Sequence, residues 1–136
     1  MQNMCVMIKP ASAICNMRCK YCFYADETSK RAVASYGIMS FNTLYSVLEK
    51  VLSKATKSCV IVFQGGEPTL AGLPFFRKAI NICKEKNVNH CNISFAIQTN
   101  GLLIDGEWCE FFAENYFLVG ISLDGPKELH DANRPD

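Results

Sequence analysis

The sequence predicts an α/β fold, a parallel-stranded partial (β/α) barrel made of roughly the first four βα units. Apolar residues switch between a strand period and a helix period four times along the 136 residues. This alternation implies parallel strands joined by right-handed crossover connections. Four units are about half of an eight-unit barrel of roughly 250 residues. We therefore expect one domain, residues 1–136, that is incomplete at its C-terminal side.

The first half of the chain supplies two strands and one helix. A short buried strand is expected at Cys5–Ile8, and a polar stretch follows the cysteine-rich segment at 26–35. Ser40 then caps a helix. The continuous apolar run Cys59–Phe63 is typical of a parallel strand covered on both faces. One face of the helix carries Phe41, Leu44, Tyr45, Leu48, Val51 and Leu52.

The second half repeats the pattern twice. A helix has Pro74 near its first turn, and Ile93, Phe95 and Ile97 alternate as the third strand. Asp105 caps a short helix, and a fourth strand follows at Phe117–Leu123. After that strand we expect only a loop, so no helix would cover the fourth strand's edge. The first of these helices turns inward Phe76, Ala79, Ile80 and Cys83, and the second holds Trp108, Cys109, Phe111 and Phe112.

The composition is that of a globular protein. Fourteen Lys and Arg against thirteen Asp and Glu leave a net charge of +1, and no basic stripe stands out. We therefore expect no nucleic-acid partner and no anionic membrane surface. No apolar stretch approaches the roughly 20 residues of a membrane helix. The first residues lack the charge and cleavage site of a signal peptide, which favours a cytoplasmic location.

Cysteine is the unusual residue type, with eight in 136. Without a secretion signal, metal or redox chemistry is a stronger explanation than a disulfide scaffold. Three cysteines, Cys15, Cys19 and Cys22, fall within eight residues. The other five stand singly in apolar segments and are expected to be small buried hydrophobes, namely Cys5, Cys59, Cys83, Cys91 and Cys109.

The unusual clusters all follow predicted strands. In parallel α/β folds, ligands bind at the carboxyl ends of the strands. The three cysteines follow the first strand, and Gln64–Pro68 follows the second. Gln98–Gly101 and Ser122–Pro126 follow the third and the fourth. Four clusters on one rim indicate a single site.

The spacing C-x3-C-x2-C offers three thiolates on a short loop. Structural zinc takes four ligands, usually as two separated pairs, and His90 and His130 are not at ligand spacing. An iron–sulfur cubane ordinarily takes four cysteines, so three would leave one iron open to substrate. The pattern favours this cluster, with zinc and reactive or disulfide-forming thiols as the alternatives.

The other rim residues each allow two interpretations. Gly65-Gly66-Glu67-Pro68 is either a glycine turn or a close backbone approach to a ligand, with Glu67 accepting from an ammonium group. Ser122 and Asp124 are either turn formers or contacts to ligand hydroxyls. Arg134 is either a surface arginine or a residue that binds a carboxylate through two parallel hydrogen bonds. Their position on the rim favours the binding roles.

These residues resemble two known motifs. Cys15 to Tyr24 resembles the cluster signature of the radical S-adenosylmethionine superfamily, and Gly65 to Pro68 resembles its methionine-amine motif. Within the superfamily, four segments resemble the anaerobic sulfatase-maturating enzymes: Lys9–Ser12, Gln64–Gly72, Gln98–Gly101 and Ser122–Pro126.

The resemblance implies cofactors and their contacts. Cys15, Cys19 and Cys22 would bind a [4Fe-4S] cluster whose fourth iron takes the amine and carboxylate of S-adenosyl-L-methionine. The implied contacts are the Tyr21 backbone to the adenine, Gly66 and Glu67 to the methionine amine, Gln98 and Ser122 to the ribose, and Arg134 to the methionine carboxylate, with Asp124 as a further polar contact. Reductive cleavage would then give a 5′-deoxyadenosyl radical.

The resemblance also implies a reaction and its partners. A radical SAM oxidoreductase of this branch oxidises a sulfatase Cys or Ser to formylglycine, using a low-potential electron donor such as flavodoxin or ferredoxin. The general base would lie in the missing half of the barrel, so no catalytic acid or base is assigned, and auxiliary clusters are not expected in this chain. The alternatives are another radical SAM peptide modifier, such as one forming thioether crosslinks, and a non-catalytic iron–sulfur fragment.

Overall fold

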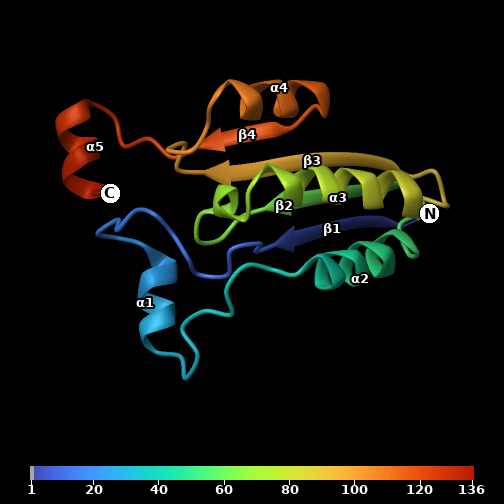
Figure 1. Cartoon of the computed structure of the whole chain (residues 1–136), viewed down its shortest axis with the longest axis horizontal. Helices are drawn as coiled ribbons and strands as arrows, with labels where there is room; N and C mark the ends of the chain where they lie inside the picture. Colours follow the sequence, from blue (N-terminus) through green and yellow to red (C-terminus); the bar gives the residue numbers. More distant parts are fainter. Residues whose placement is uncertain (1) are drawn as a thin grey trace.

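Four parallel strands form one sheet in the order β1-β2-β3-β4 (Figure 1). The computed structural model describes residues 2–136. The strands are β1 (Asn3–Ile8), β2 (Ser58–Phe63), β3 (Asn92–Thr99) and β4 (Leu118–Ile121). The helices are α1 (Phe23–Ser29), α2 (Phe41–Leu52), the 3-10 turn η1 (Pro68–Ala71), α3 (Leu73–Lys86), α4 (Gly106–Glu114) and α5 (Lys127–Asn133). The predicted α/β class and the parallel direction of the strands are confirmed.

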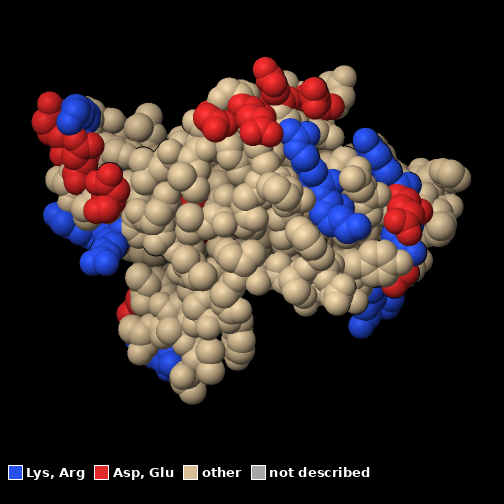
Figure 2. All heavy atoms as spheres, viewed as in Figure 1, with Lys and Arg blue, Asp and Glu red and all other residues tan. Residues whose placement is uncertain are grey.

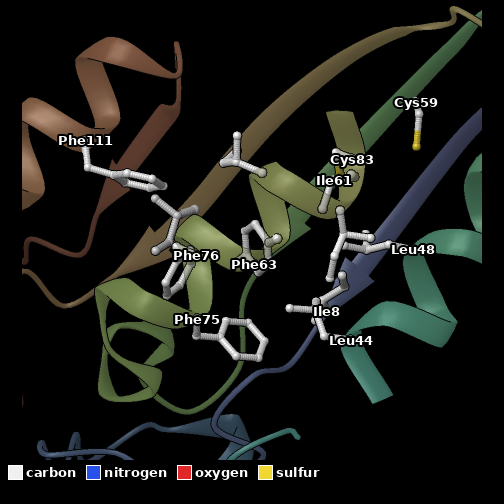
Figure 3. Packing of buried hydrophobic residues seen from close by; sticks show 14 of the residues in the cluster. Ile8, Leu44, Leu48, Cys59, Ile61, Phe63, Phe75, Phe76, Cys83 and Phe111 are labelled. Atoms are coloured by element: carbon white, nitrogen blue, oxygen red, sulfur yellow. The ribbon is translucent and has the colours of Figure 1, made fainter. Parts of the chain in front are cut away.

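The core lies between the sheet and the layer of α2, α3 and α4 (Figure 3). Leu44, Leu48 and Leu52 of α2 are fully buried, as their helical spacing predicts. An aromatic cluster joins α3 to α4, with the ring centroids of Phe76 and Trp108 5.2 Å apart. Close-packed aromatic pairs stabilise a fold beyond what their buried apolar area alone contributes. This layer fixes the strand ends and therefore the rim that follows them.

Two predictions of strand burial were wrong. Cys5 and Met7 of β1 are exposed, so β1 is not a buried strand. In β2, only alternate residues are buried, such as Ile61 and Phe63, while Val60 and Val62 are partly exposed. The cause is that the helices pack on one face of the sheet only. The continuous apolar run of β2 therefore did not reveal whether helices cover one face of the sheet or both.

Three short helical elements were not predicted. The polar stretch after the cysteines begins with α1, and η1 follows β2. The segment after β4 contains α5, where a loop was expected. Helix α5 does not cover the edge of β4, but lies beyond the carboxyl ends of the strands (Figure 1). These helices have seven residues or fewer, too short for a clear apolar period.

The caps that the sequence predicted are present. The Ser40 hydroxyl accepts from the amide of Thr43, and the Asp105 carboxylate accepts from the amide of Trp108, both at the starts of helices. Pro74 stands in the first turn of α3 as expected. The fourth strand is shorter than predicted, because only Leu118–Ile121 pairs with β3.

The scattered cysteines divide into two groups. Cys59, Cys83 and Cys91 are buried, which confirms their prediction as small core residues. Cys5 and Cys109 are exposed, so the same prediction was wrong for them. Burial raises the pKa of Cys59 to about 11 and that of Cys83 to about 12. Both of these core thiols are therefore protonated near neutral pH.

Charged residues lie outside the core. On the face drawn in Figure 2, acidic side chains gather over α4 beside basic ones over α3. Arg77 and Glu107 form an ion pair of 3.2 Å there. Exposed pairs of this kind contribute little to stability. Within residues 2–136, no helix combines the length and the apolarity that crossing a bilayer requires.

We predict that Leu48→Ala lowers the free energy of unfolding by about 2–5 kcal/mol, because it opens a cavity in a fully buried site. Leu118→Ala is the matched control, since that side chain is 75% exposed, and it should change the value by no more than about 0.5 kcal/mol. Urea denaturation of both variants measures the difference. Equal losses would contradict the assigned core.

Candidate functional site

The loops at the carboxyl ends of all four strands enclose one pocket of about 320 Å³. Nearly all of the site residues that the sequence predicted line it. Asp124 is the exception, and it reaches the pocket wall through Arg134. A larger hollow of about 510 Å³, between α3, β3 and α4, holds none of them. The predicted residues on the pocket wall are Cys15, Cys19, Cys22, Tyr21, Gly66, Glu67, Gln98, Ser122 and Arg134.

The cysteine loop presents three free thiols. Cys15 is exposed, and Cys19 and Cys22 are partly buried. Asn100 Nδ2 donates to the Cys15 sulfur at 3.8 Å, and Arg134 Nη1 donates to the Cys19 sulfur at 3.6 Å. Although Cys15 is exposed as a residue, partial desolvation of its thiol by the surrounding loops is the main cause that raises its pKa. Each of these two sulfurs therefore has a polar donor from another part of the rim.

The donor set fits an iron–sulfur cluster better than a single metal ion. Within residues 2–136, no three Cys, His, Asp or Glu side chains converge as a mononuclear metal site does. Zinc requires its sulfur ligands at about 2.3 Å from one point. A cubane instead gives each thiolate its own iron, so the thiolates can stand apart. Besides the 320 Å³ pocket, a neighbouring cavity of about 380 Å³ is also lined by all three cysteines. The loop thus has open space beside it.

The two glycines after β2 make room for the chain itself. A Cβ on Gly66 would lie 2.3 Å from the carbonyl oxygen of Ile14, and one on Gly65 would lie 2.9 Å from the Lys9 side chain. Gly66 also has φ +57°, which favours glycine. The glycines therefore let β1, the cysteine loop and β2 approach closely. Both glycines also line the pocket, so the predicted close approach of their backbone to a ligand stays a prediction.

The Glu67 carboxylate links the ends of β2 and β3 through hydrogen bonds. Its Oε1 accepts from the Thr69 amide at 3.0 Å and from the hydroxyls of Thr69 and Thr99 at 2.6 and 2.7 Å. Its Oε2 accepts from the Asn100 amide at 2.7 Å. Glu67 is 1% exposed. Its side chain therefore ties the protein together, while Oε2 keeps room for a further donor, and the predicted contact to an ammonium group stays a prediction.

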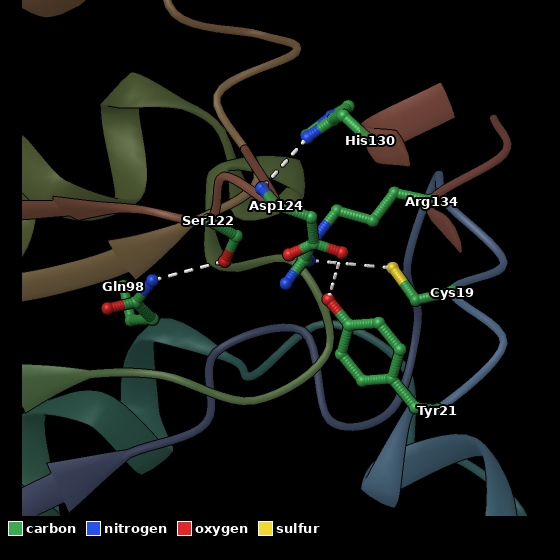
Figure 4. A network of polar contacts seen from close by, with 7 residues as sticks. All are labelled: Cys19, Tyr21, Gln98, Ser122, Asp124, His130 and Arg134. Carbon is green, nitrogen blue, oxygen red and sulfur yellow. Dashed lines mark hydrogen bonds and ion pairs between the residues drawn. The ribbon is translucent and has the colours of Figure 1, made fainter. Parts of the chain in front are cut away.

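The two residues predicted to contact a ribose lie together. Gln98 Nε2 donates to Ser122 Oγ at 3.1 Å, across β3 and β4 (Figure 4). Gly120 is opposite Gln98 in the register, and a Cβ there would lie 2.3 Å from the Gln98 amide oxygen. The absence of a side chain at Gly120 lets Gln98 lie flat across β4. The sequence did not point to Gly120, because it stands inside a strand and in no turn motif, and its role depends on the side chain of Gln98 on the neighbouring strand.

Asp124, Tyr21 and Arg134 form a polar network at the mouth of the pocket (Figure 4). The Tyr21 hydroxyl donates to Asp124 Oδ2, and Arg134 Nε donates to Asp124 Oδ1 at 2.9 Å. The hydrogen bond from Tyr21, followed by that from Arg134, lowers the pKa of Asp124, and the same bond raises the pKa of Tyr21. The Asp124 carboxylate thus binds two side chains of the protein, and its predicted contact to a ligand stays a prediction.

Three further residues of the site were not singled out from the sequence. Thr99 and Asn100 anchor Glu67, although the Gln98–Gly101 cluster had marked their position. Lys9 lays its stem along Gly65 and its ammonium 4.6 Å from the centre of the Tyr24 ring. The signal for each was its place at the carboxyl end of a strand: Thr99 ends β3, Asn100 follows it, and Lys9 follows β1.

Comparisons with known proteins show which family the chain resembles. The model of the Radical SAM superfamily matches residues 10–136. The chain is 48% identical to a cysteine-type anaerobic sulfatase-maturating enzyme of Clostridium novyi, over all of this chain and 36% of that enzyme. It is 39% identical to a serine-type anaerobic sulfatase-maturating enzyme of Bacteroides thetaiotaomicron, over 95% of this chain and 31% of that enzyme.

Solved structures agree as well. Native anSMEcpe with bound AdoMet and a Kp18Cys peptide has a TM-score of 0.91 and 48% identity, and the match covers 99% of this chain and 36% of that one. The chain therefore spans about a third of the length of the relatives that it matches.

We predict that Gly66→Ala destabilises the chain by about 1–3 kcal/mol, because the new methyl group would overlap the Ile14 carbonyl oxygen. Gly106→Ala is the matched control: it is the first residue of α4 and has open space around it, and the change should alter the free energy of unfolding by no more than about 0.5 kcal/mol. Thermal and urea unfolding measure both. Equal losses in the two variants would contradict the close packing assigned to Gly66.

Proposed function

Because the chain belongs to the radical S-adenosylmethionine superfamily, we propose that it is the cofactor-binding portion of an oxidoreductase that matures sulfatases. The cofactors of this family are a [4Fe-4S] cluster and S-adenosylmethionine. One observation carries the proposal: three thiols from one loop line the same pocket as Gln98 of β3, Ser122 after β4 and Arg134 at the end of α5. A thiol cluster alone would not need these polar groups beside it.

The residues present fit the two cofactors. Cys15, Cys19 and Cys22 would hold the cluster, and their three thiols leave one iron without a protein ligand. When bound, the two cofactors supply one-electron cleavage of the sulfonium and a carbon-centred radical. The polypeptide supplies binding, orientation and the exclusion of water.

The polar wall would orient S-adenosylmethionine. Gln98 and Ser122 are already hydrogen-bonded to each other, so two ribose hydroxyls would meet a preformed pair. Arg134 uses Nε for Asp124, which leaves other guanidinium N–H groups for a carboxylate. Glu67 lines the pocket and its Oε2 accepts only one hydrogen bond, so this oxygen and the backbone of Gly66 would bind the methionine ammonium.

The similarity to both cysteine-type and serine-type maturases supports a sulfatase peptide as the substrate. We propose that its Cys or Ser is oxidised to formylglycine, and the higher identity to the cysteine-type enzyme favours Cys. A low-potential donor such as flavodoxin or ferredoxin would supply the electron. No residue of the chain is assigned as general acid or base.

We predict that Cys19→Ala abolishes the cluster, while Cys83→Ala leaves the iron content unchanged, because Cys19 lines the pocket and Cys83 is 2% exposed in the core. Iron and sulfide analysis after anaerobic reconstitution compares the two variants with the unaltered chain. Equal iron in both would exclude the assignment of the ligands. A chain that binds the cluster but not S-adenosylmethionine would instead support a non-catalytic iron–sulfur fragment.

A further inference from the structure

Two backbone hydrogen bonds set Arg134 opposite Cys19. The Arg18 amide donates to the Pro135 carbonyl at 2.7 Å, and the Lys20 amide donates to the Asn133 carbonyl at 2.9 Å. These bonds flank Cys19 in one segment and Arg134 in the other. The pairing therefore fixes the register between the cysteine loop and the end of α5.

Side chains hold the guanidinium in place as well. Asp124 Oδ1 accepts from Arg134 Nε at 2.9 Å, and the Tyr21 ring centre lies 5.2 Å from Arg134 Cζ. Both members of the ion pair are largely buried, with 15% and 16% of their side chains exposed. In this position Nη1 is 3.6 Å from the Cys19 sulfur (Figure 4). Little freedom remains for the guanidinium to turn away.

We propose that Arg134 donates a hydrogen bond to the Cys19 sulfur of the cluster and thereby raises the cluster's reduction potential. Asp124 is the positioning residue that keeps it there. The inference rests on the proposed cluster site. Reduction adds one electron and no proton, so the negative charge on the cluster and its thiolates increases. A cationic donor at a ligand sulfur stabilises the reduced form more than the oxidised form.

The test is a redox titration of the anaerobically reconstituted full chain with dithionite as the electron source, followed by electron paramagnetic resonance without S-adenosylmethionine. Arg134→Gln should lower the equilibrium constant for reduction at least tenfold, which is about 59 mV for one electron. Arg77→Gln is the matched control, because it removes the same charge from an exposed ion pair with Glu107, and its potential should equal that of the unaltered chain. An unchanged potential in Arg134→Gln would overturn the inference.

Asp124→Asn separates positioning from simple charge. Removing a carboxylate near the cluster should by charge alone raise the potential, whereas releasing Arg134 should lower it. We expect a lower potential, and a rise would overturn the positioning role. Tyr21→Phe carries no charge change and should lower the potential less, since it removes one bond to Asp124. If Arg134→Gln fails to fold, these two variants still test whether the position of Arg134 sets the reduction potential of the cluster.

The proposed function and this inference fail in different ways. If the unaltered chain forms no cluster, the cluster site is wrong and the inference falls with it. If all variants form clusters of equal potential, the cluster site stands and only the role of Arg134 is overturned.

Discussion

The site depends on the buried carboxylate of Glu67. Isolated charges are costly to bury, and this one is stable because four donors from Thr69, Thr99 and Asn100 surround it. Its own amide donates to the Ile14 carbonyl at 2.8 Å, which ties the start of the cysteine loop to the same point. One residue thus joins the ends of β2 and β3 to the loop after β1. Cys15, which follows Ile14, takes its place from that junction.

The remaining side of the pocket is closed from β4 and α5. Gln98 reaches across Gly120 to Ser122, and Asp124 holds Arg134 over the cysteine loop. The strands are rigid and paired, whereas the residues that close the pocket lie in loops and short helices. This arrangement is general in α/β folds, in which the sheet and its helices fix the loops and the loops carry the residues that bind ligands.

Much of this could be predicted from the sequence, because periodicity reports which residues face a common layer. Leu44, Leu48 and Leu52 show this for α2, and the clusters after each strand located the site. What the sequence could not show is how a polar group is used once strands pair. The carboxylates of Glu67 and Asp124 are engaged within the protein, and the importance of Gly120 depends on a neighbour 22 residues away. Such contacts are set by sheet register and not by local pattern.

The most direct test of the account is the electron paramagnetic resonance spectrum of the reduced, reconstituted chain with and without S-adenosylmethionine. If the three thiols and the polar wall form one site, adding S-adenosylmethionine should change the signal of the [4Fe-4S] cluster, because its amine and carboxylate bind the open iron. A cluster signal that stays the same at saturating S-adenosylmethionine would contradict the claim that these residues form one cofactor site.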